Sequence, residues 1–232
     1  MPTVVFASPK GGAGKSTSAV VLSSELARTG AGTVIIDADP NRPVSKWAKL
    51  EGKPASLSVM ADVTEATIID EIETWAARVP FVVVDLEGTA SMTVAYAISR
   101  ADLVIIPVQG SQLDASEAAK AIRLIRQQEK AFNRKIPYAV LFTRTSAAIK
   151  PRLLQHIRDE LQAAGVPIFA AQMHEREAFR AIFSFGGTME TLKPSQVSNL
   201  AAAMANAKSF ASEVVSMLRH GVPAVGAGEV AA

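Results

Sequence analysis

Two lysines and three glycines are concentrated in one short segment near the N-terminus, Pro9-Lys10-Gly11-Gly12-Ala13-Gly14-Lys15-Ser16-Thr17. The segment follows the apolar run 3–7 and precedes a helical pattern that begins near Ser18. A strand, a glycine-rich turn and a helix N-terminus in this order form a cradle for phosphate groups, because the helix dipole and the main-chain N–H groups attract anions. Glycine lets the main chain approach an anion without a clash from Cβ. The segment therefore predicts nucleotide binding.

Several positions of this segment have a defined chemical role in that prediction. Lys15 would contact the β- and γ-phosphates, and the Ser16 hydroxyl would bind Mg²⁺. Pro9 stands where the phosphate-loop pattern G-x-x-x-x-G-K-[ST] has its first glycine, and a second lysine, Lys10, precedes the double glycine. The predicted nucleotide-binding residues of the segment are Gly11, Gly12, Ala13, Gly14, Lys15, Ser16 and Thr17.

Carboxylates follow two further apolar runs. Asp37 and Asp39 come after the β-branched run 33–36, and Asp85 ends the run 81–84. The carboxyl ends of parallel strands meet at the edge of a sheet where ligands bind, so these carboxylates belong beside the nucleotide. Transfer of a phosphoryl group to water needs an oriented water molecule and a bound Mg²⁺. An Asx-type turn is the alternative interpretation of Asp37 and Asp39, and an ordinary strand-end aspartate is the alternative for Asp85.

Strand and helix patterns alternate along the whole chain, which predicts a three-layer α/β/α domain with a mostly parallel, doubly wound sheet. The 232 residues suffice for one sizeable core, and we expect one domain over 1–220 and a flexible tail over 221–232. The predicted strands are 3–7, 33–37, 57–61, 81–88, 101–109, 136–143 and 166–171, and the predicted helices are 18–29, 45–50, 64–76, 113–132, 150–164 and 195–220.

The pattern K-G-G-x-G-K-[ST] at residues 10–16 resembles the deviant phosphate loop of the ParA/MinD family of P-loop ATPases, in which the early lysine is the signature. The resemblance covers essentially residues 1–220 and implies a ParA-like ATPase domain that uses ATP and Mg²⁺. It also implies that two ATP-bound chains form a homodimer in which Lys10 reaches the partner's phosphates. The catalytic residues that it implies are Lys10, Lys15 and Asp39.

The same resemblance assigns roles to residues at the ends of later strands. Asp39, in the segment D-x-D-P, matches the aspartate that positions the attacking water, and Asp37 matches the one that supports the metal and the phosphate loop. Asp85 matches the carboxylate that binds Mg²⁺ together with Ser16. Gly88 can donate its main-chain N–H to the γ-phosphate.

Two observations concern the base of the nucleotide. Arg144 follows the strand pattern 136–143, where the family contacts the base, and is our candidate for contact with adenine. The sequence has no N-K-x-D tetrad of the kind that reads guanine, which favours ATP over GTP. His174 is expected to form hydrogen bonds within a loop rather than to act in catalysis.

The resemblance further implies that the ATP-bound dimer binds DNA non-specifically through basic residues of the C-terminal third. Such binding neutralises phosphates and weakens with salt. Each of these side chains taken alone is better explained as a solvated surface charge. The candidates are Arg152, Arg158, Arg180, Lys193, Lys208 and Arg219.

The sequence does not identify the cargo on which the ATP-bound dimer acts. One possibility is partition of plasmid or chromosomal DNA with a ParB-like activator. The string at 173–179, M-H-E-R-E-A-F, looks like the ParA-type ATPases of DNA-transfer systems, which would recruit a transfer-DNA complex to a secretion machine. A MinD-like protein would instead need a membrane anchor, and the stretch 210–219 is better explained as a core-facing helix. A metabolic amidoligase is a further alternative, but no second substrate motif is visible.

Composition excludes several other classes. The chain has no cysteine, which rules out disulfides, thiolate metal sites and the iron–sulfur members of the wider family. Its 24 Lys+Arg and 22 Asp+Glu residues give a net charge of +2, so any basic surface for DNA must be local. The sequence shows no leader pattern and no apolar run of about 18 residues, so we expect a cytoplasmic protein without a membrane span.

Overall fold

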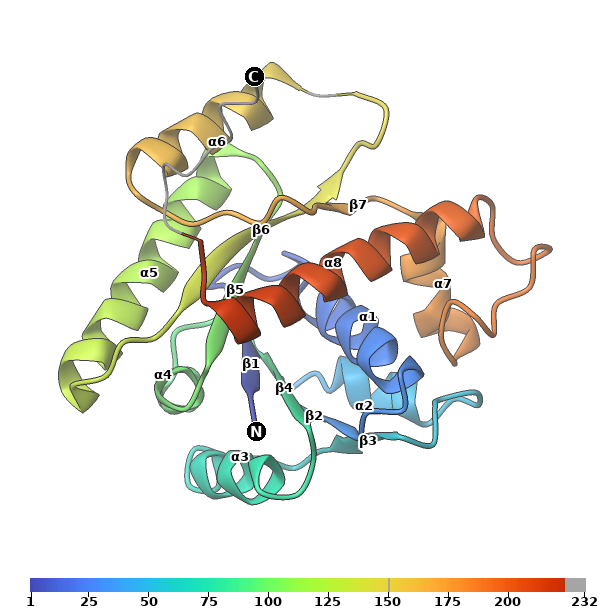
Figure 1. The fold of residues 1–232 in the computed structure, drawn as a ribbon, viewed down its shortest axis with the longest axis horizontal. Coiled ribbons are helices and arrows are strands. Elements are labelled where there is room, and N and C mark those ends of the chain that lie inside the picture. Colours follow the sequence, from blue (N-terminus) through green and yellow to red (C-terminus); the bar gives the residue numbers. More distant parts are fainter. Residues whose placement is uncertain (150, 224–232) are drawn as a thin grey trace.

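The strands form a single seven-stranded parallel sheet, seen in a computed structural model that describes residues 1–149 and 151–223 (Figure 1). Their order across the sheet is β3-β2-β4-β1-β5-β6-β7, and each pair of neighbours is parallel. The prediction of a mostly parallel, doubly wound sheet is confirmed. The strands are β1 (Thr3–Phe6), β2 (Thr33–Ala38), β3 (Leu57–Met60), β4 (Phe81–Leu86), β5 (Leu103–Val108), β6 (Tyr138–Thr145) and β7 (Met173–His174).

Helices cover both faces of this sheet, because successive strand side chains point to opposite sides and are apolar on both. In β1, Val4 and Phe6 pack on the face covered by α1, α2, α7 and α8, whereas Val5 packs on the face covered by α3, α4, α5 and α6. The expected three-layer α/β/α architecture is therefore confirmed. The helices are α1 (Lys15–Arg28), α2 (Pro43–Ala48), α3 (Ile68–Ala76), α4 (Met92–Ser99), α5 (Gln112–Phe132), α6 (Arg152–Ala163), α7 (Glu177–Phe185) and α8 (Leu200–His220).

The direction of winding reverses at the central strand β1, which lies between β4 and β5. The chain first moves from β1 toward β2 and β3, then returns to β4 and continues on the other side through β5 to β7. Open α/β sheets bind ligands at such a switch point. Asp85 of β4 is in register with Asp37 of β2 and with Phe6 of β1. The sheet thus brings the phosphate loop and both carboxylates to one edge.

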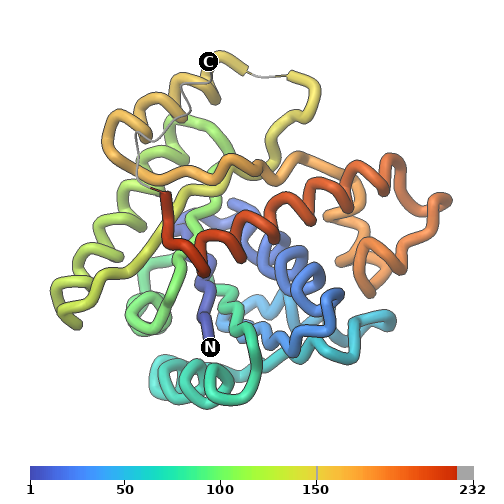
Figure 2. Tube along the Cα trace, in the orientation of Figure 1, coloured from blue at the N-terminus to red at the C-terminus, as the bar shows by residue number. Residues whose placement is uncertain are grey.

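Helix α8 lies beside α1 and β7 (Figure 2). Its apolar residues Phe210, Val214 and Met217 are buried in the core, which confirms the core-facing interpretation of this stretch. The predicted flexible tail lies, from residue 224 onward, outside the residues that the structure describes.

One predicted strand is wrong. Of the stretch 166–171, only Ile168 forms an isolated bridge, with Val140, and the last strand of the sheet comes later as β7. Pro167 has no N–H group, so a hydrogen-bonded ladder cannot run through it.

Several helix boundaries also differ from the sequence prediction. Helix α3 begins at Ile68 rather than at 64, and α8 begins at Leu200 rather than at 195. Asn199, which precedes α8, has a left-handed main chain with φ of 52°, so the helix cannot extend upstream through it. The sequence analysis predicted neither α4 nor α7.

Candidate nucleotide-binding site

The phosphate loop connects β1 to α1 and has a left-handed main chain at two of its glycines. The φ angle is 76° at Gly12 and 96° at Gly14, values that residues with a Cβ rarely adopt. Gly14 is the N-cap of α1; no side chain caps this helix, and its first turn has no acidic residue. The N–H groups of this turn are therefore available to an anion.

The segment that follows β4 packs closely against this loop. A Cβ atom at Gly88 would lie 2.8 Å from the main-chain nitrogen of Gly11 and 3.1 Å from its Cα. Only glycine fits such a contact, because the nearest atoms belong to the main chain and cannot rotate away. The structure therefore places Gly88 beside the loop, as its predicted role requires.

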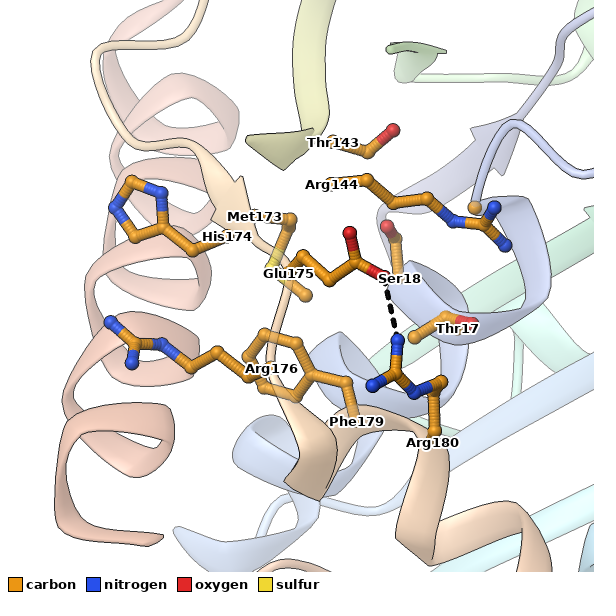
Figure 3. A pocket seen from close by; sticks show the side chains of 11 residues that line it. Thr17, Ser18, Thr143, Arg144, Met173, His174, Glu175, Arg176, Phe179 and Arg180 are labelled. Atoms are coloured by element: carbon orange, nitrogen blue, oxygen red, sulfur yellow. Dashed lines mark hydrogen bonds and ion pairs between the residues drawn. The ribbon is translucent and has the colours of Figure 1, made fainter. Parts of the chain in front are cut away.

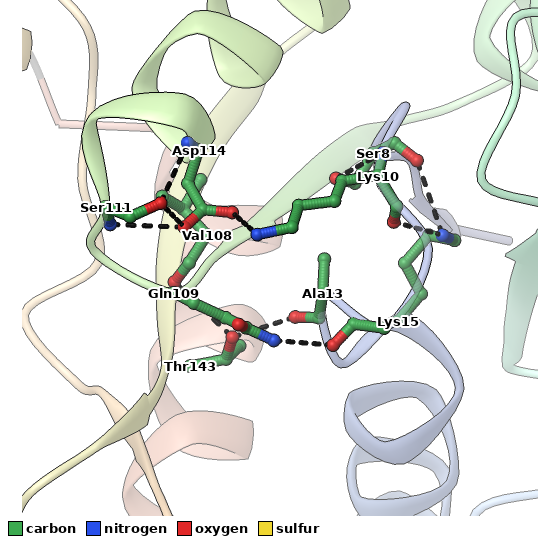
Figure 4. Close-up of polar contacts among 10 residues, drawn as sticks. Ser8, Lys10, Ala13, Lys15, Val108, Gln109, Ser111, Asp114 and Thr143 are labelled. Carbon is green, nitrogen blue, oxygen red and sulfur yellow. Dashed lines mark hydrogen bonds and ion pairs between the residues drawn. The ribbon is translucent and has the colours of Figure 1, made fainter.

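Lys15 is buried and turns back over its own loop (Figure 4). Its Nζ donates hydrogen bonds to the carbonyl oxygens of Ser8 at 3.3 Å and Lys10 at 3.2 Å. Burial lowers the pKa of Lys15, while the nearby carboxylates, Asp85 first among them, raise it. The ammonium group of Lys15 therefore lies within the phosphate loop.

Lys10, the signature lysine, is held by a residue of its own chain. Its Nζ lies 2.7 Å from Oδ1 of Asp114, which belongs to a capping box with Ser111 at the start of α5 (Figure 4). Burial of Asp114 opposes ionisation, but the hydrogen bonds from Lys10 and Ser111 outweigh it and lower the pKa. The sequence analysis did not identify Asp114 as part of the site.

Two more residues that the sequence analysis missed hold the loop in place. Gln109, just after β5, donates from Nε2 to the carbonyl oxygen of Gly12 at 2.6 Å. The Thr143 hydroxyl, in β6, donates to the carbonyl oxygen of Ala13 at 2.8 Å. Both residues stand near the carboxyl ends of strands, and this position was the signal that could have revealed them.

Two buried aspartates lie side by side at the edge of the sheet. Both carboxylate oxygens of Asp85, which is fully buried, lack a hydrogen-bond partner among the residues described. Burial raises the pKa of Asp85 to about 7, against the lowering effects of Ser16 and Lys15. Asp37 Oδ2 accepts hydrogen bonds from the Ser45 N–H at 2.7 Å and hydroxyl at 2.6 Å, but its Oδ1 has no partner within the described part of the chain. Burial raises the pKa of Asp37 as well.

These unpaired oxygens fit a divalent cation. Mg²⁺ is usually held by one or two carboxylates together with substrate phosphates, rather than by a cage of protein ligands. Residues 1–149 and 151–223 contain no group of three or more His, Cys, Asp or Glu side chains that could hold a metal on its own. Ser16 and Asp85 are the residues that would hold it.

Asp39 lies just beyond β2, half-buried, and is one of the carboxylates that act on Lys15. Its Oδ1 accepts a hydrogen bond from the Asn41 N–H at 2.8 Å, so an Asx-type turn is present. The turn and the predicted catalytic role are compatible, because a carboxylate has a second oxygen that can accept a hydrogen bond from water.

A small cavity of about 60 Å³ opens on the other side of the loop, next to the start of α1 (Figure 3). Arg144 lines it, with a left-handed φ of 51° at a register shift between β6 and β7. The Arg176 Nε atom is buried without a hydrogen-bond partner among the residues described. The lining residues are Gly14, Thr17, Ser18, Thr143, Arg144, Met173, His174, Glu175, Arg176, Phe179 and Arg180.

His174 forms hydrogen bonds as expected, but it lies in strand β7 rather than in a loop. Its Nδ1 lies 2.8 Å from the Thr145 hydroxyl oxygen. Burial, helped by the charge of Arg176, lowers the pKa of His174, although its hydrogen bond with Thr145 acts in the opposite direction.

Two of the six candidate DNA-binding residues have interaction partners in their own chain. The Arg158 guanidinium lies 5.2 Å from the centre of the Phe142 ring, and Arg180 forms an ion pair of 2.6 Å with Glu175. Arg180 is nevertheless exposed, as are the other four candidates, Arg152, Lys193, Lys208 and Arg219.

None of the helices in the described part of the chain is both long and apolar enough to cross a bilayer.

Comparison with known proteins identifies relatives across nearly the whole chain. The family described as "VirC1 protein" matches residues 1–220. The protein named ParA from Rhizobium radiobacter is 44% identical over 218 residues, which are 94% of this chain and 98% of that protein.

Solved structures share the fold at low sequence identity. The ATP complex of the D38A variant of McdA from Cyanothece superposes with a TM-score of 0.76 at 15% identity, covering 93% of this chain and 96% of that one. A cobyrinic acid a,c-diamide synthase from Mycobacterium smegmatis, solved with an ATP analogue and magnesium, gives a TM-score of 0.70 at 14% identity and covers 97% and 99%. Motif, fold and family thus agree, and the chain belongs to the VirC1 protein family, within the ParA-like ATPases.

Proposed function

We propose that this protein is a Mg²⁺-dependent ATPase whose ATP-bound form is a homodimer that acts on DNA. The observation that carries the proposal is the buried, unpaired carboxylate of Asp85 beside a phosphate loop with Lys15 at its centre. Leaving a carboxylate buried without a partner is costly, and a cation with its phosphate ligands would remove that cost. The proposal is supported by the ligands of two proteins of the same fold, ATP in the McdA complex and an ATP analogue with magnesium in the synthase.

Residues of the loop and of the neighbouring strand ends would each have a separate role in ATP hydrolysis. Lys15 exchanges its two carbonyl acceptors for the β- and γ-phosphates, and the N–H groups of residues 11–17 bind phosphate oxygens. Ser16 and Asp85 would hold Mg²⁺, which would supply positive charge beside the phosphates. Asp39 accepts a hydrogen bond from a water molecule and orients it. The oxygen of this water bonds to the γ-phosphorus as the bond to the bridging oxygen breaks, which yields ADP and phosphate.

Lys10 would complete the site of the partner chain. In the single chain Asp114 binds it, and the Lys10 side chain is 30% exposed, so it can leave Asp114 and cross to a partner. Binding of a second chain therefore has to replace one ion pair with contacts to phosphate. This exchange makes the dimer depend on the presence of the γ-phosphate.

We infer that the cargo is DNA bound non-specifically, in the cytoplasm, with partition by a ParB-like activator as the leading role. Recruitment of a transfer-DNA complex is the second candidate, and it was suggested by the string at 173–179. In the structure five of these residues line the cavity beside the phosphate loop, so the string supports a role at the nucleotide site more than it identifies the cargo. A membrane cargo is disfavoured, because the apolar side chains of α8 are buried in the core.

Phosphate release from ATP tests the enzymatic part of the proposal. We expect the purified protein to release phosphate with Mg²⁺ but not with EDTA, and we expect Lys15→Ala to abolish the reaction. Phosphate release by Lys15→Ala at the wild-type rate would contradict the proposed site. Lys193→Ala, an exposed lysine far along the chain, is the control and should hydrolyse ATP normally.

A further inference from the structure

Strand β7 is the last strand of the sheet, and only one of its sides is paired with another strand. It comprises two residues, Met173 and His174, and pairs with β6. The main-chain groups on its free side need other partners, because unpaired groups of this kind are costly when partly buried. The strand is important for the site, since residues 173–176 line the cavity beside the phosphate loop.

Helix α8 supplies those partners with one amide side chain. Oδ1 of Asn206 accepts a hydrogen bond from the His174 N–H at 3.0 Å, and its Nδ2 donates to the carbonyl oxygen of Gln172 at 2.6 Å. A carboxamide offers a donor and an acceptor side by side, as a peptide group does. Asn206 therefore takes the place of a neighbouring strand.

A second side chain of the same helix holds the chain just upstream. The two carboxylate oxygens of Glu213 accept hydrogen bonds from the N–H groups of Ala170 and Ala171, each at 2.7 Å. Asn206 and Glu213 are seven residues apart and so lie on one face of α8, separated by a rise of about 10 Å. Three residues of extended chain also span about 10 Å. The spacing on the helix thus matches the spacing of the groups that it holds.

We propose that Asn206 and Glu213 are positioning residues that hold the wall of the base-binding cavity in the shape that accepts the base of the nucleotide. Neither residue is part of the cavity lining, so their effect would pass through the main chain of residues 170–174. A wall that is already ordered binds its ligand without the cost of ordering it. This inference rests on the proposed function, because it takes the cavity to be the site of the base.

The test compares ATP with inorganic tripolyphosphate, which carries the phosphates but no base. Both affinities are measured by calorimetry for the wild-type protein and for Asn206→Leu, which keeps the approximate size of the side chain but removes both hydrogen bonds. We expect the affinity for ATP to fall about tenfold and the affinity for tripolyphosphate to stay unchanged. Ser212→Ala, at an exposed position of the same helix, is the matched control and should change neither.

A milder variant keeps the test decisive if Asn206→Leu does not fold. Glu213→Gln replaces one of the two acceptor oxygens with an NH₂ group, and we expect a smaller loss of the same kind. Equal losses for ATP and tripolyphosphate, or no loss of ATP affinity in either variant, would overturn the inference. A wild-type protein that binds neither compound would overturn the proposed function itself, and this inference with it.

Discussion

The folded protein buries the Asp85 carboxylate, and burial disfavours its ionised form. Burial raises its pKa to about 7, so between about pH 4 and pH 7 the folded protein holds a proton that the unfolded chain releases. The folded state is then the one that binds more protons, and stability without ligand falls as the pH rises through this interval. Above pH 7 the folded protein contains a buried negative charge that only a cation can neutralise.

Replacement of Asp85 by Asn should separate these effects. Asn cannot ionise, so we expect Asp85→Asn without ligand to be more stable than the wild type at pH 8, by on the order of a few kcal/mol, with the difference largely lost at pH 5. Urea unfolding at the two pH values measures this. The variant should also lose the stabilisation that ATP with Mg²⁺ gives to the wild type. A variant that is less stable than the wild type at pH 8 would contradict the assigned role of burial.

Removal of the Lys10 side chain leaves the buried carboxylate of Asp114 without its ion-pair partner. Lys10→Ala should retain ATP binding but lose hydrolysis, because the proposed role of Lys10 is at the partner's phosphates. It should also destabilise the folded chain by about 1–3 kcal/mol, since the buried carboxylate of Asp114 loses its hydrogen bond and ion pair with Lys10. The double variant Lys10→Ala/Asp114→Asn should recover part of the stability but none of the activity. Normal turnover by monomeric Lys10→Ala would rule out the sandwich dimer.

Removal of the Asp39 carboxylate is expected to stabilise the ATP-bound dimer, whereas removal of the Lys10 ammonium group is expected to prevent it. If it orients the attacking water, Asp39→Ala should bind ATP, stop hydrolysis and accumulate as an ATP-bound dimer. Size-exclusion chromatography with ATP measures the dimer, and phosphate release measures turnover. Asn41→Ala is the control, because it preserves the N–H group that donates to Asp39. An unstable dimer with normal turnover in Asp39→Ala would eliminate the proposed role.

The connection between β4 and α4 carries a contact that depends on the absence of a side chain. Gly88→Ala would place a Cβ atom 2.8 Å from the Gly11 nitrogen, so the phosphate loop or the segment after β4 must move. We expect ATP affinity to fall at least tenfold, measured by calorimetry. Gly30→Ala is the matched control: its φ of 84° makes it strained by about 1 kcal/mol, but nothing lies within 4 Å of the new Cβ. Equal ATP binding by Gly88→Ala and the wild type would contradict the packing argument.

The parts of the site that the sequence could predict are those encoded in neighbouring residues. The loop 9–17 and the carboxylates Asp37 and Asp85 stand directly after apolar strands, so their position at the sheet edge follows from the pattern. The contacts of Asp114, Gln109 and Thr143 with the loop join residues about a hundred positions apart, and no local pattern encodes them.

The errors in the predicted fold have a similar origin. The run 166–171 is apolar enough for a strand, but Pro167 prevents a continuous ladder, and the later strand β7 forms hydrogen bonds with Asn206 of the distant helix α8. Helix α7 has only nine residues, too few for a helix that is stable alone, and it is stabilised by burial against α1 and α8. Whether such segments form strands or helices depends on tertiary packing, which no single segment determines.

The charge of the whole molecule gives no preference for DNA, because the net charge is only +2. Any affinity must then come from a local arrangement of cations, and dimer formation would double the number of cations that face one duplex. Four of the proposed residues, Arg152, Lys193, Lys208 and Arg219, are free to contribute because they are exposed. Arg158 and Arg180 would first have to leave Phe142 and Glu175.

Binding to arbitrary duplex DNA, measured with ATP, with ADP and without nucleotide across a series of salt concentrations, therefore tests the molecule as a whole. We expect binding with ATP alone, and we expect the affinity to fall steeply with salt because each neutralised phosphate releases counterions. Lys193→Ala and Lys208→Ala should each reduce the slope of log affinity against log salt by about one per DNA-bound contact that is lost, with ATP hydrolysis unchanged. Lys10→Ala, which cannot complete the dimer, should bind no DNA in any state. Binding that is equal in all three nucleotide states would contradict the switch, and hydrolysis without any DNA binding would point to a protein or membrane cargo instead.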